Sequence, residues 1–349
     1  MATTLTLPSQ VQAPPVPGAV EIDVRLTPLD LYRAERTIVW RQVRLLMLLC
    51  AAIVSLRVFL GGGLPLLLTV AVIGLFSFVI LSALLYMGAR STLRTSRVLG
   101  GTLHYSFEPT CLRSRGETFW SIQDWSSLHE VLETSKLLIL RSSSAQKVVI
   151  PKRFLLGGNL EKVRAVARKS PHPSPIPAQA TRTSTAGGLT ATVHMEVDDL
   201  YQGFLIMLLR KSYWYAAQLA FSFVLFFAVN PNFLTPTQFV FFGSIFFLFV
   251  AISLYRASGR AIRTNIAYQS AIAYSFGSSG LESSGSTFAF HHDWGNFQSI
   301  IEGSKILVFC PSNAQMMIVP KRSFADANQI SALRQLLKTH FHGKLSLKH

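Results

Sequence analysis

The sequence predicts an α+β membrane protein, with four transmembrane helices in two hairpins and two small antiparallel β domains, each closed by a C-terminal helix. Three observations predict this fold class. The pattern from Tyr105 to Arg153 returns without a gap from Tyr274 to Arg322, 169 positions later, which indicates a duplication. Residues 58–89 and 212–255 contain no charged side chain. The chain is 14% charged, below the roughly 25% of soluble domains, yet its formal net charge is +16.

The duplication and the shifts in composition divide the chain into seven segments. The N-terminal segment and the middle of the chain are rich in Pro, Ser and Thr and have little to bury, which is typical of tails and linkers. We expect a disordered N-terminal tail (1–28), a first transmembrane hairpin (29–95), a first β domain (96–169), a flexible linker (170–193), a second transmembrane hairpin (194–264), a second β domain (265–342) and a basic tail (343–349).

Each predicted hairpin consists of two apolar segments close to the roughly 20 residues that a bilayer requires. Glycines and a proline break the helix in the first hairpin, and asparagines and prolines form the turn in the second. Arginines flank the outer ends of the hairpins and not the turns, so the positive-inside rule predicts a multi-pass protein with both termini in the cytoplasm. The four predicted spans are Thr37–Leu60, Leu66–Met87, Ser212–Val229 and Gln238–Tyr255.

The repeated segments outside the spans read as short strands followed by one helix. Apolar runs joined by Ser, Asn and Pro are typical of β-hairpins, and Pro151 and Pro320 end the last strand because proline has no N–H to donate. Ile330, Leu333 and Leu337 then recur at helical spacing. The predicted hairpins are Lys136–Arg141 with Gln146–Ile150, and Lys305–Cys310 with Gln315–Val319.

The duplicated cations are the candidate binding residues, and the duplicated aromatic residues are candidates for the core. Cations close to an anionic lipid surface contribute on the order of 1 kcal/mol each. The alternative is a solvated strand end with ordinary basic decoration. The candidate lipid- or partner-binding residues are Lys136, Lys152, Arg153, Lys305, Lys321 and Arg322. The structural core candidates are Trp125, Trp294, Tyr105 and Tyr274, with Asp124 and Asp293 expected to cap the turn beside each tryptophan.

Other chemistry is not indicated by the residue patterns. His291 and His292 are adjacent in a predicted strand and therefore point to opposite faces, so we predict no metal site. Cys50, Cys111 and Cys310 form neither a disulfide framework nor a CxxC pair. We find no catalytic constellation and no aromatic spacing suited to base stacking. We therefore predict no enzyme activity, no cofactor and no nucleic-acid partner.

The pattern resembles the YcxB-like family of bacterial membrane proteins. Trp125-Ser126 and Ile150-Pro151-Lys152-Arg153-Phe154 match its motifs in the first copy, and Trp294 and Val319-Pro320-Lys321-Arg322 match in the second. Gly295-Asn296 and Ser323 depart from them, and the family typically shows one copy. The resemblance implies domains similar to pleckstrin-homology (PH-like) modules, as a bent barrel or sandwich, and no catalytic activity.

These observations favour a non-enzymatic integral protein of the bacterial inner (plasma) membrane, whose duplicated cytoplasmic domains bind a protein partner or anionic lipid headgroups. Membrane lipids and a membrane or cytoplasmic protein are the expected partners, and a homo-oligomer is compatible with the pattern. Two alternatives stay open. One is a transporter or channel component in which Arg57 faces an aqueous path, and the other is a membrane accessory or immunity-type protein.

Overall fold

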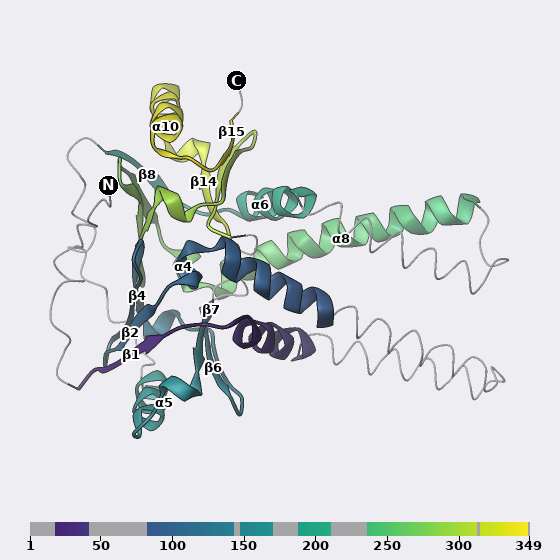
Figure 1. Ribbon diagram of the computed structural model, residues 1–349. Coiled ribbons are helices and arrows are strands. Elements are labelled where there is room, and N and C mark those ends of the chain that lie inside the picture. The colour runs from purple at the N-terminus through teal and green to yellow at the C-terminus, as the bar shows by residue number, and fades with distance from the viewer. Residues whose placement is uncertain are drawn as a thin grey trace, which may run out of the picture.

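The computed structural model describes residues 18–41, 82–142, 147–169, 188–210, 236–312 and 315–347 (Figure 1). We call residues 18–169 unit 1 and residues 188–347 unit 2. Residues 28–41 and 82–95 of unit 1 are helical. The other elements of unit 1 are β1 (Val20–Val24), α4 (Arg97–Gly100), β2 (Leu103–Phe107), β3 (Cys111–Arg115), β4 (Phe119–Asp124), η2 (Trp125–Ser127), β5 (Glu130–Glu133), β6 (Leu137–Arg141), β7 (Lys147–Pro151), η3 (Lys152–Phe154) and α5 (Asn159–Lys169).

Unit 2 repeats this order of elements. It contains β8 (Leu189–Val193), α6 (Val197–Arg210), α8 (Pro236–Thr264), α9 (Ile266–Gln269), β9 (Ile272–Phe276), β10 (Gly280–Ser284), β11 (Phe288–Asp293), η5 (Trp294–Asn296), β12 (Ser299–Glu302), β13 (Ile306–Cys310), β14 (Met317–Pro320), η6 (Lys321–Ser323), α10 (Ala327–His340) and β15 (Lys344–Ser346).

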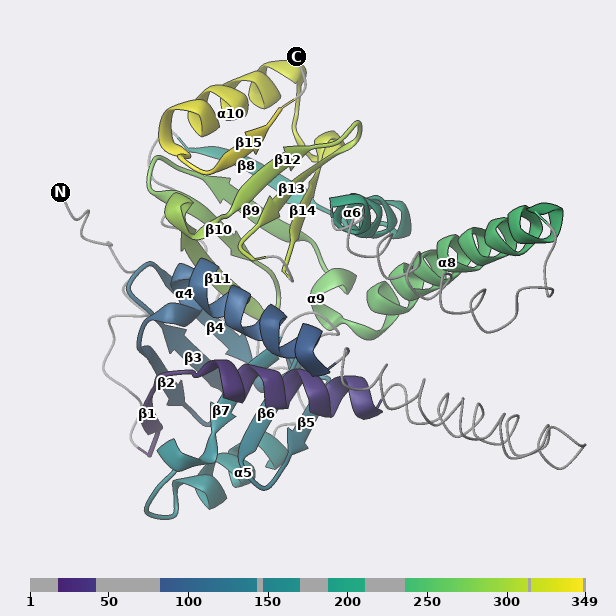
Figure 2. The same ribbon diagram turned by 45° about the vertical axis from the view of Figure 1, so that its right-hand side comes forward.

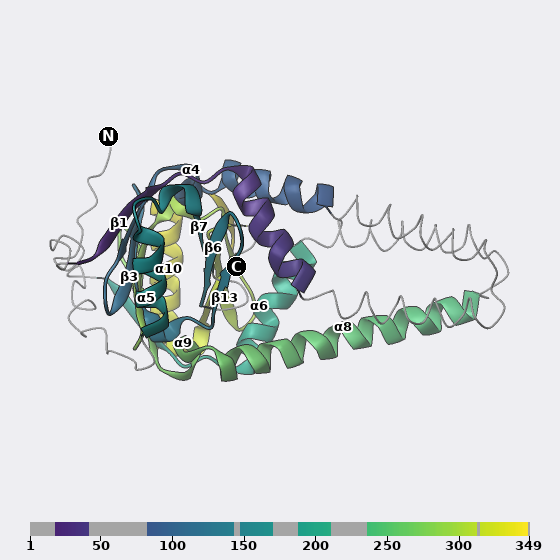
Figure 3. The same ribbon diagram turned by 90° about the horizontal axis from the view of Figure 1, so that it is seen from below.

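A long antiparallel sheet runs through both units. Its order is β1-β2-β3-β4-β11-β10-β9-β8, so each unit contributes four strands. The remaining strands form a three-stranded sheet, β5-β6-β7, and a four-stranded sheet, β14-β13-β12-β15. In Figure 3 the small sheets lie between the long sheet and the helices that extend to the right. Figure 2 shows α5 and α10 at opposite ends of the assembly, each closing its own unit.

The strands β4 and β11 join the units about a local twofold axis. Ser121 pairs with Phe290, which is its own counterpart 169 residues later, and Phe119 and Gln123 pair with His292 and Phe288. Each of these pairs is therefore the image of the other. Such an isologous contact is the usual way for two copies of one surface to meet, and it covers the edges that β4 and β11 would otherwise expose.

Each unit keeps a hydrophobic core of its own. Phe107 and its counterpart Phe276 are almost fully buried, and they lie on the faces of β2 and β9 that alternate inward. The core of unit 1 includes Ile139 and Ile150, and that of unit 2 includes Phe309 and Leu337. Because the units each bury such a core, the β4–β11 junction connects two folded bodies.

Three strands occupy segments that the sequence assigns to the tails and the linker. Val20–Val24 lies in the predicted tail, Leu189–Val193 in the predicted linker and Lys344–Ser346 in the predicted basic tail. The first two pair antiparallel with β2 and β9, while the last pairs parallel with β12. Each of the first two presents alternate buried side chains to a core, which explains why it is ordered.

The predicted transmembrane helices require correction. None of the helices in the described part of the chain combines the length and the apolar character that crossing a bilayer requires. Helix α6 has 14 residues, and the last third of the 29-residue α8 carries Arg256, Arg260 and Arg263. Residues 42–81 and 211–235, with most of the first three predicted spans and Arg57, lie outside the described residues.

For the part of the chain that the structure describes, this finding contradicts the predicted fold class of four transmembrane helices. It also contradicts the multi-pass localisation in the inner membrane that depended on those helices. The fold is a mixed α/β arrangement with large antiparallel sheets, and its two β units share one continuous sheet.

Candidate functional site

The predicted binding residue Arg153 forms an ion pair inside unit 1. Asp30 lies in the first turn of the helix at residues 28–41 and accepts hydrogen bonds from the backbone N–H and the hydroxyl of Thr27, at 2.9 and 2.7 Å. The guanidinium of Arg153 donates to both oxygens of this carboxylate, at 2.8 and 2.7 Å, and to the carbonyl of Arg25 at 3.3 Å. Burial would raise the pKa of Asp30, but the hydrogen bonds from Arg153 and Thr27 outweigh it and lower the pKa.

Arg322 makes the same contacts in unit 2. It donates to both oxygens of Asp199 at 2.6 Å and to the carbonyl of His194 at 3.1 Å. Both carboxylates are buried and both arginines are about half exposed. We call each set the Arg–Asp clamp, since it fixes the start of a helix to the turn that follows the last strand of the small hairpin.

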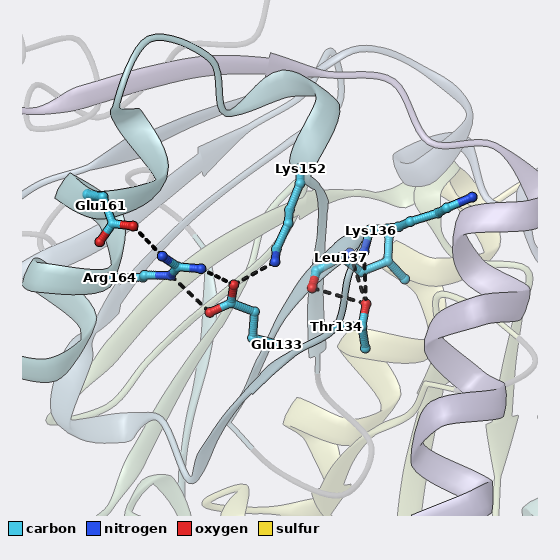
Figure 4. Close-up of polar contacts among 7 residues, drawn as sticks. All are labelled: Glu133, Thr134, Lys136, Leu137, Lys152, Glu161 and Arg164. Carbon is cyan, nitrogen blue, oxygen red and sulfur yellow. Dashed lines mark hydrogen bonds and ion pairs between the residues drawn. The ribbon is translucent and has the colours of Figure 1, made fainter.

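The predicted binding residue Lys152 is also held by a carboxylate (Figure 4). Its ammonium lies 2.5 Å from Glu133, and the guanidinium of Arg164 on α5 contacts the same carboxylate. Hydrogen bonds from Arg164 and Lys152 lower the pKa of Glu133 to about 2. In Figure 4 the side chain of Lys136 points away from this cluster.

Unit 2 repeats the cluster around Glu302. Lys321 lies 2.5 Å from this carboxylate, and Arg334 on α10 donates to both of its oxygens, at 3.0 and 2.6 Å. The side chain of Glu302 is fully buried, whereas that of Glu133 is 28% exposed. Four of the six predicted binding residues therefore stabilise the units internally. The other two, Lys136 and Lys305, are exposed on the β-turns that precede β6 and β13 and form no ion pair among the described residues.

The predicted core residues lie in the core. Trp125 and Trp294 are each 3% exposed, and their indole N–H groups donate to the carbonyls of Glu108 and Gly277 at 2.8 and 2.9 Å. Tyr105 and Tyr274 are buried beside them, and burial raises the pKa of both phenols.

The two predicted caps differ. The carboxylate of Asp124 accepts from the backbone N–H of Ser126 at 2.7 Å and so caps η2, as the sequence suggests. Asp293 makes no such contact with η5 and instead lies 3.0 Å from Nε2 of His291.

His291 and His292 lie on opposite faces of the long sheet at the junction of the units. Burial would lower the pKa of His291, but Asp293 and Glu282 outweigh it and raise the pKa to about 9. Burial and the charge of His291 lower the pKa of His292 to about 3. No group of three or more His, Cys, Asp or Glu side chains among the described residues is placed to hold a metal ion.

A cavity of about 250 Å³ lies on the local twofold axis, and we call it the dyad cavity. It is partly open to solvent and receives side chains from both units. Phe119, Ser121 and Gln123 of β4 point to it from one side of the axis, and Phe288, Phe290 and His292 of β11 do so from the other, because residues paired across antiparallel strands share a face. Further equivalent pairs in the lining are Leu103 with Ile272, Tyr105 with Tyr274, Lys147 with Met316 and Val148 with Met317.

The dyad cavity contains none of the six predicted binding residues, and sequence analysis missed it. Its lining depends on the pairing of β4 with β11, which no local pattern reveals. The partners of the predicted cations carried a signal, however. Asp30 and Asp199 belong to a repeated Asp-Leu-Tyr, and Glu133 and Glu302 to a repeated Glu-x-Ser-Lys. Repeated acids at the same interval as repeated bases indicate conserved ion pairs within each copy.

No family model, curated protein or solved structure matches the chain. The resemblance to the YcxB-like family therefore stays a prediction.

Proposed function

We propose that the protein is a non-enzymatic binding protein that holds a small ligand in the dyad cavity. The observation that carries the proposal is the lining, in which equivalent residues of the two units converge on one partly open space. Ligand sites occur preferentially at the boundary between domains and are mostly apolar with a few polar groups. The volume of about 250 Å³ lies slightly below the roughly 300–1,000 Å³ of sites for drug-sized molecules, which favours a small ligand.

The test is binding of N-phenyl-1-naphthylamine, a neutral apolar dye, measured by its fluorescence on titration with the full chain. Ser121→Phe copies the residue of the equivalent position, Phe290, and places an aromatic ring in the cavity. We expect this variant to weaken dye binding at least about tenfold. Glu21→Phe introduces the same ring on the exposed outer face of β1 and should leave binding unchanged.

If Ser121→Phe binds the dye as tightly as the wild type does, the dye binds outside the cavity and the proposal is refuted. Circular dichroism of both variants establishes that each is folded as the wild type is, so that loss of binding reports filling of the cavity.

A second function is favoured by Lys136 and Lys305. These lysines occupy equivalent turns, are exposed, and take part in no ion pair within the described ranges. Two such charges suit recognition of an acidic protein surface, an interaction that salt weakens. Binding of a poly-glutamate peptide at low ionic strength should fall in the Lys136→Ala/Lys305→Ala variant and persist in Lys338→Ala, an exposed lysine of α10. Equal binding by the two variants would exclude these turns.

A further inference from the structure

The dyad cavity has a symmetric frame and an asymmetric lining. At three equivalent positions unit 1 supplies a polar side chain where unit 2 supplies an apolar one. These pairs are Ser121 with Phe290, Ser142 with Pro311, and Lys147 with Met316. Leu99 with Tyr268 differs in the other direction. Three of these four differences, including the one that involves a charged side chain, therefore make the half of the cavity that unit 1 lines the more polar one.

The largest of these differences is an ion pair. Lys147 of β7 contacts the carboxylate of Glu35, on the helix at residues 28–41, and the two side chains are 21% and 33% exposed. The counterparts of this pair in unit 2 are Met316 and Phe204. Both line the cavity, and both pack against the core of unit 2. A charged contact in one unit has therefore become an apolar one at the equivalent place in the other.

The sign of the charge follows from which member of the pair faces the cavity. The lining includes Lys147 but not Glu35, so the lysine is the member of the pair whose side chain reaches the cavity. Hydrogen bonds between an ammonium and an anionic oxygen are roughly twice as strong as neutral ones. At the opposite end, Met316, Met317 and Phe290 present flexible thioethers and a ring, which adapt well to an apolar group.

We propose that the ligand of the dyad cavity is a small anionic amphiphile, with its anionic head toward Lys147 and its apolar part toward Met316 and Met317. This inference rests on the proposed function, because it names the ligand class of the same cavity. A symmetric lining suits a symmetric or wholly apolar ligand, whereas this lining offers unlike surroundings to the two ends of one molecule.

Two dyes with a common skeleton test the inference on the full chain. N-phenyl-1-naphthylamine is neutral, and 1-anilinonaphthalene-8-sulfonate adds an anionic sulfonate to the same rings. The Glu35→Phe/Lys147→Met variant copies unit 2 and leaves no unpaired charge behind. We expect it to weaken binding of the sulfonate about tenfold, as loss of a charged hydrogen bond predicts, and to leave binding of the neutral dye within about twofold.

Two further variants complete the experiment. Lys147→Gln removes the charge but keeps a donor to Glu35, so it should show the same selective loss even if the double variant folds poorly. Lys338→Met makes the same change at an exposed lysine of α10, outside the cavity, and should affect neither dye. An unchanged ratio of the two affinities in Lys147→Gln overturns the anionic amphiphile. Failure of the wild type to bind either dye instead overturns the proposed function.

Discussion

Unit 1 and unit 2 share the polar contacts that stabilise each unit internally, and they differ in the side chains with which they face each other. The Arg–Asp clamp, the glutamate cluster and the tryptophan hydrogen bond recur in both units with nearly the same distances. The cavity lining and the junction, in contrast, differ between the units. Unit 1 has Lys147 and Ile122 where unit 2 has Met316 and His291 at the equivalent positions. Each unit must provide hydrogen-bond donors to its own buried carboxylates, and the internal contacts are therefore alike in the two units. A site on a twofold axis is present once, so its two halves are free to diverge.

The same contrast appears beside the junction. In unit 1 the thiol of Cys111 lies 3.4 Å from Glu108, and burial and this carboxylate raise the pKa of the thiol to about 11. The counterpart of Cys111 is Gly280, where a Cβ atom would lie 2.2 Å from the carbonyl oxygen of His292. The strands β10 and β11 approach too closely there for a side chain. The units therefore differ in backbone packing next to the axis as well as in side chains.

The largest effect should come from breaking an Arg–Asp clamp, and it should be equal in the two units. Arg153→Ala leaves the buried carboxylate of Asp30 without its partner, and Arg322→Ala does the same to Asp199. We expect each to lower the free energy of unfolding by about 3 kcal/mol, measured by urea denaturation. Arg115→Ala, at an exposed arginine of β3, should cost less than about 0.5 kcal/mol. A large loss in only one unit would contradict the equivalence of the clamps.

Substitutions in the glutamate clusters should destabilise the two units to different extents. Glu302→Gln removes a fully buried carboxylate from Lys321 and Arg334, and we expect a loss of about 2–3 kcal/mol. Glu133→Gln should cost less than about 1 kcal/mol, since solvent screens the partly exposed carboxylate. Urea denaturation of both variants measures the difference in unfolding free energy. Glu161→Gln, at a glutamate whose side chain is 74% exposed, is the control. Equal losses would show that burial does not distinguish the clusters.

Between pH 6.5 and 9 the junction should make stability depend on pH through His291, because its counterpart Ile122 does not titrate and the lowered pKa of His292 keeps that imidazole neutral. The folded pKa of about 9 lies above the ordinary value of 6.5, so the charged imidazolium stabilises the fold fully below pH 6.5. That contribution is lost as the pH rises from 6.5 through about 9. Thermal denaturation from pH 6 to 10 should show this loss in the wild type and a flatter profile in His291→Gln. A wild-type slope that survives the substitution would assign the titration to another group.

The smallest effect should come from the exposed lysines. Lys136→Ala and Lys305→Ala each remove a side chain without an ion-pair partner in the described parts of the chain, so we expect changes in unfolding free energy within about 0.5 kcal/mol. Lys321→Ala, which removes the partner of buried Glu302, is the matched comparison and should cost clearly more. If Lys136→Ala lowers the free energy of unfolding as much as Lys321→Ala does, Lys136 stabilises the fold and the prediction is wrong.

The elements of the β units were largely predictable. The apolar runs and their turns predicted Lys136–Arg141 with Gln146–Ile150, and the structure has β6 at Leu137–Arg141 and β7 at Lys147–Pro151. Helical spacing predicted the last helix, in which Leu333 and Leu337 are buried. These patterns were informative because periodicity and turn residues act over a few neighbouring positions.

The candidate site was not predictable, and the reason is distance along the chain. Arg153 and Asp30 are 123 positions apart, so nothing near Arg153 showed that a carboxylate would take up its charge. Low charge content likewise predicted transmembrane helices, and the described helices contradict them. Each repeated arginine forms an ion pair with an acid that is repeated at the same interval, Asp30 in unit 1 and Asp199 in unit 2.

The sequence alone determined the duplication, the β-hairpins and the helix that follows them in each unit. These features depend on identity at a fixed interval and on patterns among neighbouring residues. The tertiary structure alone decided that β4 meets β11 with Ser121 opposite Phe290. That register places Ser121 and Phe290 on the cavity side of the sheet and Trp120 and His291 on the other. A shift by one residue would exchange the faces, and the pairing of two distant strands sets it.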